Sequence, residues 1–193
     1  MIAAALLACA ANVAPVTLQA IIQVESGGNP LTVNVNGVRV QPSPAKTAAE
    51  AAQIARAYIA RGFSVDLGLM QVNSRNLSFL GLTIEDVLDP CINVRSGGEI
   101  LTANYAEAAR SRGAGQAALQ AALSAYNTGD FYRGFGNGYV ARYYGPNGVP
   151  AIVGPIHVQA TLADKPVRRA PPPSPLTADT TVFAREVSDV RIQ

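Results

Sequence analysis

The chain has 193 residues, of which 49% are hydrophobic and 15% are charged, so it can bury the core of one domain and carry an appendage. Fifteen Lys and Arg residues oppose thirteen Asp and Glu residues, a balance too even to favour a nucleic acid as partner. One histidine and two cysteines predict no metal site, and we expect no other cofactor. No apolar stretch reaches the roughly 20 residues that cross a bilayer, so we expect no integral membrane span.

The first eleven residues, MIAAALLACAA, are apolar and resemble the remnant of an export signal. Residues 8–10 fit an A-x-A cleavage pattern, and residues 6–9 resemble the box at which bacterial lipoproteins are cut and acylated, with Cys9 as the lipid anchor. A further alternative pairs Cys9 with Cys91 in a disulfide, which suits an oxidising compartment such as the bacterial periplasm. Two unpaired, buried cysteines are the remaining alternative.

Residues 151–193 form a proline-rich tail, because seven of the thirteen prolines lie at position 150 or later. The run RRAPPPSP predicts an extended polyproline spacer. The alternative is an unstructured tail without a function.

Residues 12–150 form the predicted domain, and helix signals open it. Pro15 starts a helix that ends at Gly27 and Gly28, with apolar residues spaced by three and four along one face. Thr47 and Glu50 form a capping box before an alanine-rich helix that runs to Arg61.

Three more helices follow in the second half of this domain. Thr83 and Asp86 predict a short helix that ends at Pro90, and Asn93 is the expected N-cap of a longer one through Arg112. The third contains Tyr126 on its apolar face and ends at Gly129. Strand signal is confined to residues 32–40, where alternation around Asn36-Gly37 predicts a β-hairpin. The predicted fold is therefore mainly α, an α+β domain with a small hairpin.

Glu25 falls on the same helical stripe as Leu18, Ile21 and Ile22, so the face that packs on the core ends in a carboxyl group. Burial disfavours the charged form and raises the pKa, as a general acid near neutral pH requires. The alternative is that Glu25, near a helix end, turns to solvent or bonds to the amides of Gly27 and Gly28.

Two further polar clusters interrupt apolar sequence: GLMQVN at 68–73 and AYNTG at 125–129. Their amide groups and neighbouring apolar side chains suit a sugar, which needs directed hydrogen bonds and apolar contact with its ring. Each residue also has a simpler interpretation, since Met70 and Tyr126 can fill the core, Asn73 can cap a helix, and Asn127 can form a turn.

The blocks ESGGNP at 25–30, GLMQVN and AYNTG occur in the order found in soluble lytic transglycosylase domains. With VAPVTLQAIIQVES before them and Asp89-Pro90-Cys91 after the second block, the chain resembles the VirB1-like proteins of bacterial type IV secretion systems over residues 9–135. The resemblance implies a lysozyme-like fold, a periplasmic location in a Gram-negative bacterium, and cleavage of the MurNAc-β-1,4-GlcNAc bond of peptidoglycan to leave a 1,6-anhydro end. We expect a monomer that acts on glycan strands.

The resemblance also assigns roles. Glu25 is the catalytic acid, which protonates the glycosidic oxygen and then takes the proton of the C6 hydroxyl as that oxygen attacks C1. Ser26 orients the acid, unless it is only a cap. The remaining implied substrate-site residues are Met70, Gln71, Asn73, Tyr126, Asn127 and Tyr139. No second acid lies inside the blocks, and we expect Asp66 and Asp130 to be surface or turn residues.

Two other functions stay open. A muramidase of the goose-lysozyme type shares the fold and the acid but admits water to C1. A wall-binding assembly module would keep the fold without activity, although Glu25 argues against it. For an enzyme that opens the wall for a secretion or conjugation apparatus, the tail is a candidate docking arm for components of that system.

Overall fold

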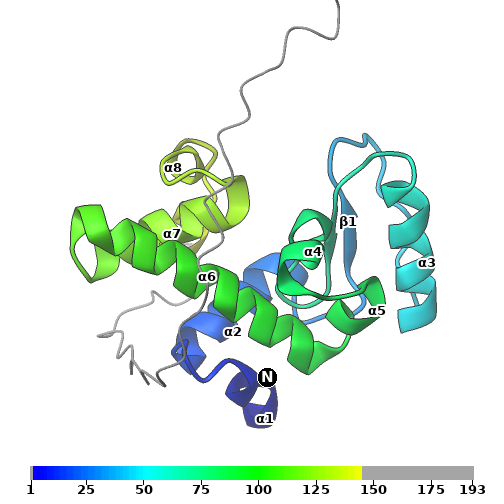
Figure 1. The fold of residues 1–193 in the computed structure, drawn as a ribbon, viewed down its shortest axis with the longest axis horizontal. Coiled ribbons are helices and arrows are strands. Elements are labelled where there is room, and N and C mark those ends of the chain that lie inside the picture. The colour runs from blue at the N-terminus through cyan, green and yellow to red at the C-terminus, as the bar shows by residue number, and fades with distance from the viewer. Residues whose placement is uncertain (1, 145–193) are drawn as a thin grey trace, which may run out of the picture. The chain divides into compact units, whose positions relative to one another are not determined.

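A computed structural model of the chain describes residues 2–144, and these form a mainly helical structure with a small antiparallel sheet (Figure 1). The elements are α1 (Ala4–Leu7), η1 (Ala8–Ala10), α2 (Pro15–Ser26), β1 (Val33–Val35), α3 (Ala48–Ile59), β2 (Val65–Leu67), β3 (Val72–Asn73), η2 (Ser74–Asn76), α4 (Leu77–Leu80), α5 (Ile84–Val87), α6 (Pro90–Arg112), α7 (Gln116–Thr128), α8 (Arg133–Gly136) and α9 (Ala141–Tyr144). The predicted tail at 151–193 lies outside the described residues.

Besides a small cluster of Ala108, Ala118 and Ala121, two large hydrophobic clusters support this structure. One contains buried residues of α1, η1, α2, α6, α7 and α9, and the other joins the sheet to α3, α4 and α5. In Figure 1, helix α6 runs across the molecule from the neighbourhood of α5 to that of α7, and it packs extensively on α7. The long helix therefore holds the two clusters together.

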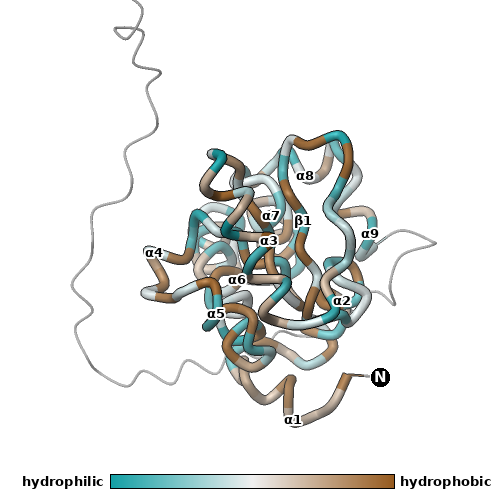
Figure 2. Tube along the Cα trace, turned by 90° about the vertical axis from the view of Figure 1, so that its right-hand side faces the viewer, coloured by the Kyte–Doolittle hydropathy of each residue, from teal (hydrophilic) through white to brown (hydrophobic). Residues whose placement is uncertain are grey.

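The N-terminal segment takes part in the first cluster. Leu7 and Ala10 are buried there, and the apolar character of α1 is plain in Figure 2. A disulfide joins Cys9 of η1 to Cys91 near the start of α6, with 5.4 Å between the Cα atoms. Of the predicted alternatives for Cys9, the disulfide is the one found.

The predicted hairpin at 32–40 is wrong, although Gly37 does adopt the positive φ of a turn, 83°. Strand β1 pairs instead with β2, with Val35 opposite Val65, and β2 pairs with β3, with Asp66 opposite Asn73. The Gln41 side chain both donates to and accepts from the Val35 backbone, at 2.9 and 2.8 Å. This carboxamide satisfies the edge of β1 in place of a second hairpin strand.

Most helix predictions are confirmed, including the cap by Thr47, which accepts from the Glu50 N–H at 3.1 Å. The reciprocal half of that capping box is absent because the Glu50 carboxylate accepts from the Lys46 N–H. A full capping box occurs instead at Thr83 and Asp86 before α5.

The predicted N-cap role of Asn93 is wrong. Helix α6 begins earlier, at Pro90, and its cap is Asp89, whose carboxylate accepts from the Ile92 N–H at 2.9 Å. Proline at the first helical position needs no hydrogen-bond acceptor, which explains the earlier start. Asn93 lies inside the helix and is buried.

Within residues 2–144, no single helix is both long enough and apolar enough to cross a membrane. The apolar helices at the N-terminus, α1 with η1 and then α2, meet at an angle of 101°.

Candidate active site

Glu25 occupies the last turn of α2, on the apolar stripe that the sequence predicts. Leu18, Ile21 and Ile22 are fully buried, and Glu25 continues their face with its side chain half-buried. Gly27 then ends the helix in the left-handed region, with φ of 61°, and its N–H donates to the Gln23 carbonyl. The expectation that Glu25 turns to the amides of the glycine loop is not met, because its Oε1 atom accepts a hydrogen bond from the Tyr139 hydroxyl.

The pKa of Glu25 is raised to about 7, as the stripe predicts. Burial is the main cause, and the charge of Asp66 adds to it. The hydrogen bond from Tyr139 and the charge of Arg142 act in the opposite direction but are weaker. Glu25 can therefore hold a proton near neutral pH and release it with little cost, as proton transfer in both directions requires.

The Glu25 carboxyl lines a pocket of about 210 Å³, and this pocket shares lining residues with a second one of about 490 Å³. We call the two together the groove. The shared lining residues are Asn36, Asp66, Gln71, Tyr126 and Asn127. The combined space suits several sugar units, and most of its polar lining consists of carboxamides, which both donate and accept hydrogen bonds.

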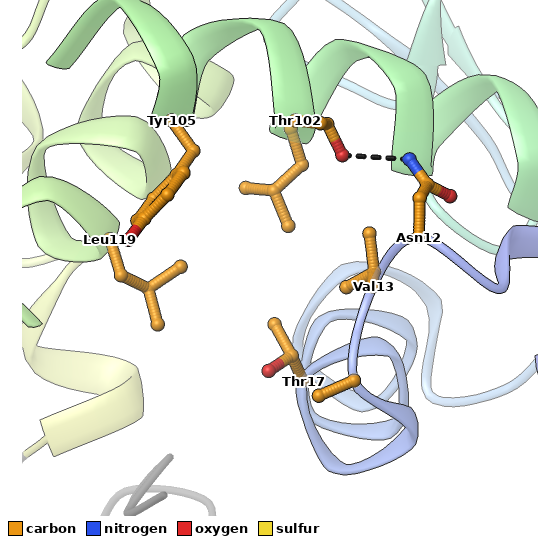
Figure 3. A pocket seen from close by; sticks show the side chains of 8 residues that line it. Asn12, Val13, Thr17, Thr102, Tyr105 and Leu119 are labelled. Atoms are coloured by element: carbon orange, nitrogen blue, oxygen red, sulfur yellow. Dashed lines mark hydrogen bonds between the residues drawn. The ribbon is translucent and has the colours of Figure 1, made fainter. Parts of the chain in front are cut away.

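A separate cavity between α2, α6 and α7 is too small for a ligand of this kind. It measures about 30 Å³, and Figure 3 shows Val13, Leu119 and Tyr105 around it, with the Asn12 carboxamide donating to the Thr102 hydroxyl at 2.8 Å. A space of this size holds about one or two water molecules.

The loop at residues 68–71 connects β2 to β3, and three hydrogen bonds tie its backbone to three helices. Ser26 of α2 donates to the Leu69 carbonyl at 2.8 Å, Tyr126 of α7 donates to the Met70 carbonyl at 2.7 Å, and Asn93 of α6 accepts from the Met70 N–H at 2.8 Å. The three sequence blocks thus meet at one backbone segment, which fixes Gln71 at the groove.

Asn93 is the residue of this arrangement that sequence reasoning misplaced. Its carboxamide also donates to the carbonyls of Leu67 and Val87, at 2.9 and 2.8 Å, so every polar atom is used. Gly68 approaches it so closely that an added Cβ would lie 2.3 Å from the Asn93 Nδ2 atom. A polar residue inside the first turns of a helix was the available signal, since burial there requires dedicated partners.

Met70 does not reach the groove with its side chain. The side chain is fully buried in the first cluster, where it lies against Gly97 of α6. The implied contact between Met70 and a sugar ring is therefore not supported, and core filling, the simpler interpretation, describes this residue. Its contribution to the site is the backbone carbonyl that Tyr126 binds.

Gln71 lines both pockets of the groove, in a backbone conformation that only glycine usually adopts, with φ of 50°. Its carboxamide nitrogen donates to the Gly68 carbonyl at 2.8 Å, and its oxygen accepts from Asn34 at 2.7 Å. The amide is thus held by its neighbours, and a ligand would meet it as a preorganised group.

Asp66 of β2 lines both pockets of the groove, so the expectation of a surface or turn residue is wrong. Asn73 donates to its Oδ1 atom at 2.5 Å, and Asn36 donates to its Oδ2 atom at 2.8 Å. Burial raises the pKa of Asp66, and the two amide hydrogen bonds oppose this shift. The apolar alternation of β2 concealed the residue, because only the pairing of β1 and β2 brings it to the groove.

Asn127 is exposed at the groove, where its oxygen accepts from the Asn137 carboxamide at 3.1 Å. Asp130 is a turn residue as predicted, since its carboxylate accepts from the N–H groups of Tyr132 and Arg133.

No group of three or more His, Cys, Asp or Glu side chains within residues 2–144 could hold a metal ion.

Tyr139 lies in the segment between α8 and α9, which brings it to Glu25. Tyr143 of α9 is a further residue of the site, and the sequence analysis did not predict it. The Tyr139 and Tyr143 hydroxyls lie 2.8 Å apart, and both side chains are buried. Burial raises the pKa of both phenols, so each stays protonated at all ordinary pH values. The two tyrosines lie four positions apart, but Tyr139 precedes α9, so no helical periodicity pointed to the pair.

The transglycosylase SLT domain family matches this chain over residues 3–141, and the chain belongs to that family. The family and the helical structure with its small sheet confirm the predicted lysozyme-like fold class.

Among individual relatives, the chain is 43% identical over 134 residues to protein virB1 of Agrobacterium fabrum, which covers 69% of the chain and 54% of that relative. It is 37% identical over 164 residues to the type IV secretion system protein virB1 of Brucella suis, which covers 84% of the chain and 65% of that relative. The chain thus spans between about half and two thirds of the length of these relatives. No solved structure gives a significant match.

Proposed function

We propose that the chain is a peptidoglycan lytic transglycosylase that cleaves the MurNAc-β-1,4-GlcNAc bond and leaves a 1,6-anhydro end. The observation that carries this proposal is the Glu25 carboxyl, which lines a groove of carboxamides and has a pKa of about 7. Membership of the SLT family and the similarity to virB1 proteins support the same activity.

In this reaction Glu25 donates its proton to the glycosidic oxygen as the bond to C1 breaks. The resulting carboxylate then takes the proton of the C6 hydroxyl while O6 bonds to C1, so Glu25 ends in its starting state. Asp66 contributes a second negative charge in the groove, where it would stabilise the positive charge that develops at C1. The carboxamides of Gln71, Asn73 and Asn127 are the groups that would bind the sugar hydroxyl and acetamido groups.

A muramidase is the second candidate, and Asp66 is the observation that favours it. Glycosidases that admit water generally use two carboxyl groups, and this groove holds two. The two candidates differ in the chain ends that they produce, since hydrolysis leaves a reducing muramic acid and transglycosylation leaves an anhydro end.

The test is digestion of purified peptidoglycan with the wild type and Glu25→Gln, followed by mass spectrometry of the new chain ends. We expect anhydro ends from the wild type and a loss of activity of at least about 100-fold in Glu25→Gln. Glu99→Gln removes an exposed carboxyl of α6 and is the matched control, which should digest peptidoglycan like the wild type. Reducing ends would identify a muramidase instead, and full activity of Glu25→Gln would contradict the role of Glu25 as the acid in either reaction.

We also propose a periplasmic location and a role in a type IV secretion or conjugation apparatus. The disulfide between Cys9 and Cys91 suits the oxidising periplasm, and the similarity to a type IV secretion system protein supports the secretion role. The tail at 151–193 is the proposed docking arm. Its removal should leave digestion of purified peptidoglycan unchanged and reduce transfer by the secretion system, whereas lost digestion would assign the tail to the catalytic domain.

A further inference from the structure

Tyr143 is a buried phenol that the proposed reaction does not use. Its side chain is fully buried, and its ring meets that of Tyr139 edge to face, with 5.4 Å between the ring centroids. A hydroxyl buried in this way is costly unless it is hydrogen-bonded. The partner of the Tyr143 hydroxyl is the Tyr139 hydroxyl, 2.8 Å away.

The direction of this hydrogen bond follows from counting protons. Each phenol carries one O–H hydrogen, and that of Tyr139 is donated to Oε1 of Glu25. When Glu25 is ionised, it has no hydrogen to return, so the Tyr139 oxygen can act only as an acceptor toward Tyr143. The chain of donors therefore runs one way, from Tyr143 to Tyr139 and then to Glu25.

We propose that Tyr143 is a positioning residue for the acid: by donating to Tyr139, it holds the Tyr139 hydrogen on Oε1 of Glu25 and leaves Oε2 to carry the transferred proton. The acid role of Glu25 rests on the proposed function, but the hydrogen-bond chain does not. No proton moves along the chain, because both phenols keep theirs throughout.

The consequence lies in the ionised state of Glu25. When Oε2 gives its proton to the glycosidic oxygen, the new negative charge is stabilised by the Tyr139 hydrogen bond, and a bond donated by Tyr143 to the same oxygen polarises that hydroxyl and strengthens it. The other groups that face Glu25 are Arg142, which favours ionisation, Asp66, which opposes it, and Tyr126, which is neutral at working pH. Removal of the Tyr143 hydroxyl alone should therefore raise the pKa of Glu25.

The chain offers a matched control in the next residue of the same helix. Tyr144 donates through its hydroxyl to the Gln116 carboxamide at 3.0 Å and has no hydrogen bond to Glu25 or Tyr139 within the described residues. Tyr143→Phe and Tyr144→Phe each remove one hydroxyl and keep the ring, so they differ in their connection to the acid.

The experiment measures the pKa of Glu25 by NMR titration of the full chain with 13C-labelled glutamate carboxyl groups, together with the pH profile of peptidoglycan digestion. Tyr143→Phe should raise the pKa by about 0.3 to 1, which corresponds to a two- to tenfold higher proton affinity, and reduce kcat with KM unchanged. Tyr144→Phe should change neither. An unchanged pKa in Tyr143→Phe, or the same shift in both variants, would overturn the proposal.

A double variant separates coupling through Tyr139 from a general loss of packing. Tyr139→Phe should raise the pKa of Glu25 more than Tyr143→Phe does, and adding Tyr143→Phe to it should produce no further shift. Additive shifts would mean that Tyr143 acts independently of Tyr139 and would contradict the proposal. The NMR titration needs no activity, so a failure of the proposed function would appear separately, as a wild type without anhydro products.

Discussion

Asp66 and Glu25 line one pocket, and the charge of Asp66 raises the pKa of Glu25. The two acids come from different clusters of the fold, since Glu25 ends a core helix and Asp66 lies on the central strand of the sheet. Amide donors of Asn36 and Asn73 hold the Asp66 carboxylate, while Glu25 receives one phenol hydrogen. The two amide hydrogen bonds oppose the rise that burial causes in the pKa of Asp66, whereas burial raises the pKa of Glu25 to about 7, so Glu25 is suited to hold the proton.

The pH dependence of peptidoglycan digestion should reflect the proton on Glu25. Because burial raises the pKa of this carboxyl to about 7, activity should be high below that value and fall tenfold per pH unit well above it. Initial rates measured at subsaturating substrate from pH 5 to 9 would reveal this limb. Constant activity up to pH 9 would mean that the free enzyme does not need a protonated Glu25.

Asp66→Asn should shift that limb toward lower pH, because the negative charge of Asp66 raises the pKa of Glu25. The rate should also fall by about 10- to 100-fold if Asp66 stabilises positive charge at C1. The same rate measurements test both effects, with Glu99→Gln as the control. If the rate fell but the pH at which activity declines stayed the same, Asp66 would have no electrostatic effect on Glu25.

Glu25→Gln should stabilise the folded protein at pH 8. The pKa of Glu25 is 4.5 in the unfolded chain and about 7 in the folded protein. The free energy of unfolding of the wild type therefore decreases as the pH rises from 4.5 to 7, because the unfolded chain loses this proton first. We expect a gain of about 1 to 3 kcal/mol in the free energy of unfolding at pH 8 and almost none at pH 4. Urea denaturation at both values measures it, and an equal effect at the two pH values would indicate a cause other than the carboxyl charge.

Loss of the disulfide should reduce stability without altering the groove. Cys9 and Cys91 are 82 positions apart in the chain, and opening a loop of this size costs about 2 to 5 kcal/mol. Cys9→Ser/Cys91→Ser should therefore unfold at lower urea concentration and retain peptidoglycan digestion at 25 °C. The double variant is the proper comparison because neither single variant leaves the other thiol paired. Unchanged stability would contradict the expected contribution.

Gly97→Ala should destabilise the protein and impair digestion together. An added Cβ would lie 2.7 Å from the Met70 Cβ atom, so either α6 or the loop at 68–71 must move. Such overpacking costs about 1 to 3 kcal/mol, and displacement of the loop would also misplace Gln71. Gly136→Ala, where an added Cβ meets nothing within 4 Å, is the control. Equal stability of the two variants would contradict the prediction, because it would show that Met70 accommodates the added Cβ at little energetic cost.

Local patterns in the sequence were sufficient for helices α2, α3, α5 and α7, for most of α6, and for the acid, but they did not predict the short helices α1, α4, α8 and α9. The spacing of Leu18, Ile21, Ile22 and Glu25 places the carboxyl at the end of a buried stripe, because a helix of 3.6 residues per turn aligns those positions whatever packs against them. The glycines after the helices are signals of the same kind, since their left-handed conformations are set within a few residues.

Other features depended on contacts between distant segments. The alternation around Asn36-Gly37 predicted a local hairpin, but β1 pairs with β2 instead, and the Gln41 side chain forms hydrogen bonds with the free edge of β1. Met70 belongs to a block that suggested a sugar contact, and the close approach of Gly97 buries it instead. In both cases packing between distant elements overrode the local pattern.

What the sequence determined by itself was the five longer or capped helices, α2, α3, α5, α6 and α7, and the burial of Glu25, because these follow from periodicity and capping over short distances. Only the tertiary structure decided that Asp66 faces the groove, that Asn93 holds the loop at 68–71, and that Tyr143 connects through Tyr139 to the acid. These relationships join residues between 4 and 118 positions apart, and they depend on the packing of distant elements against one another, which no local pattern specifies.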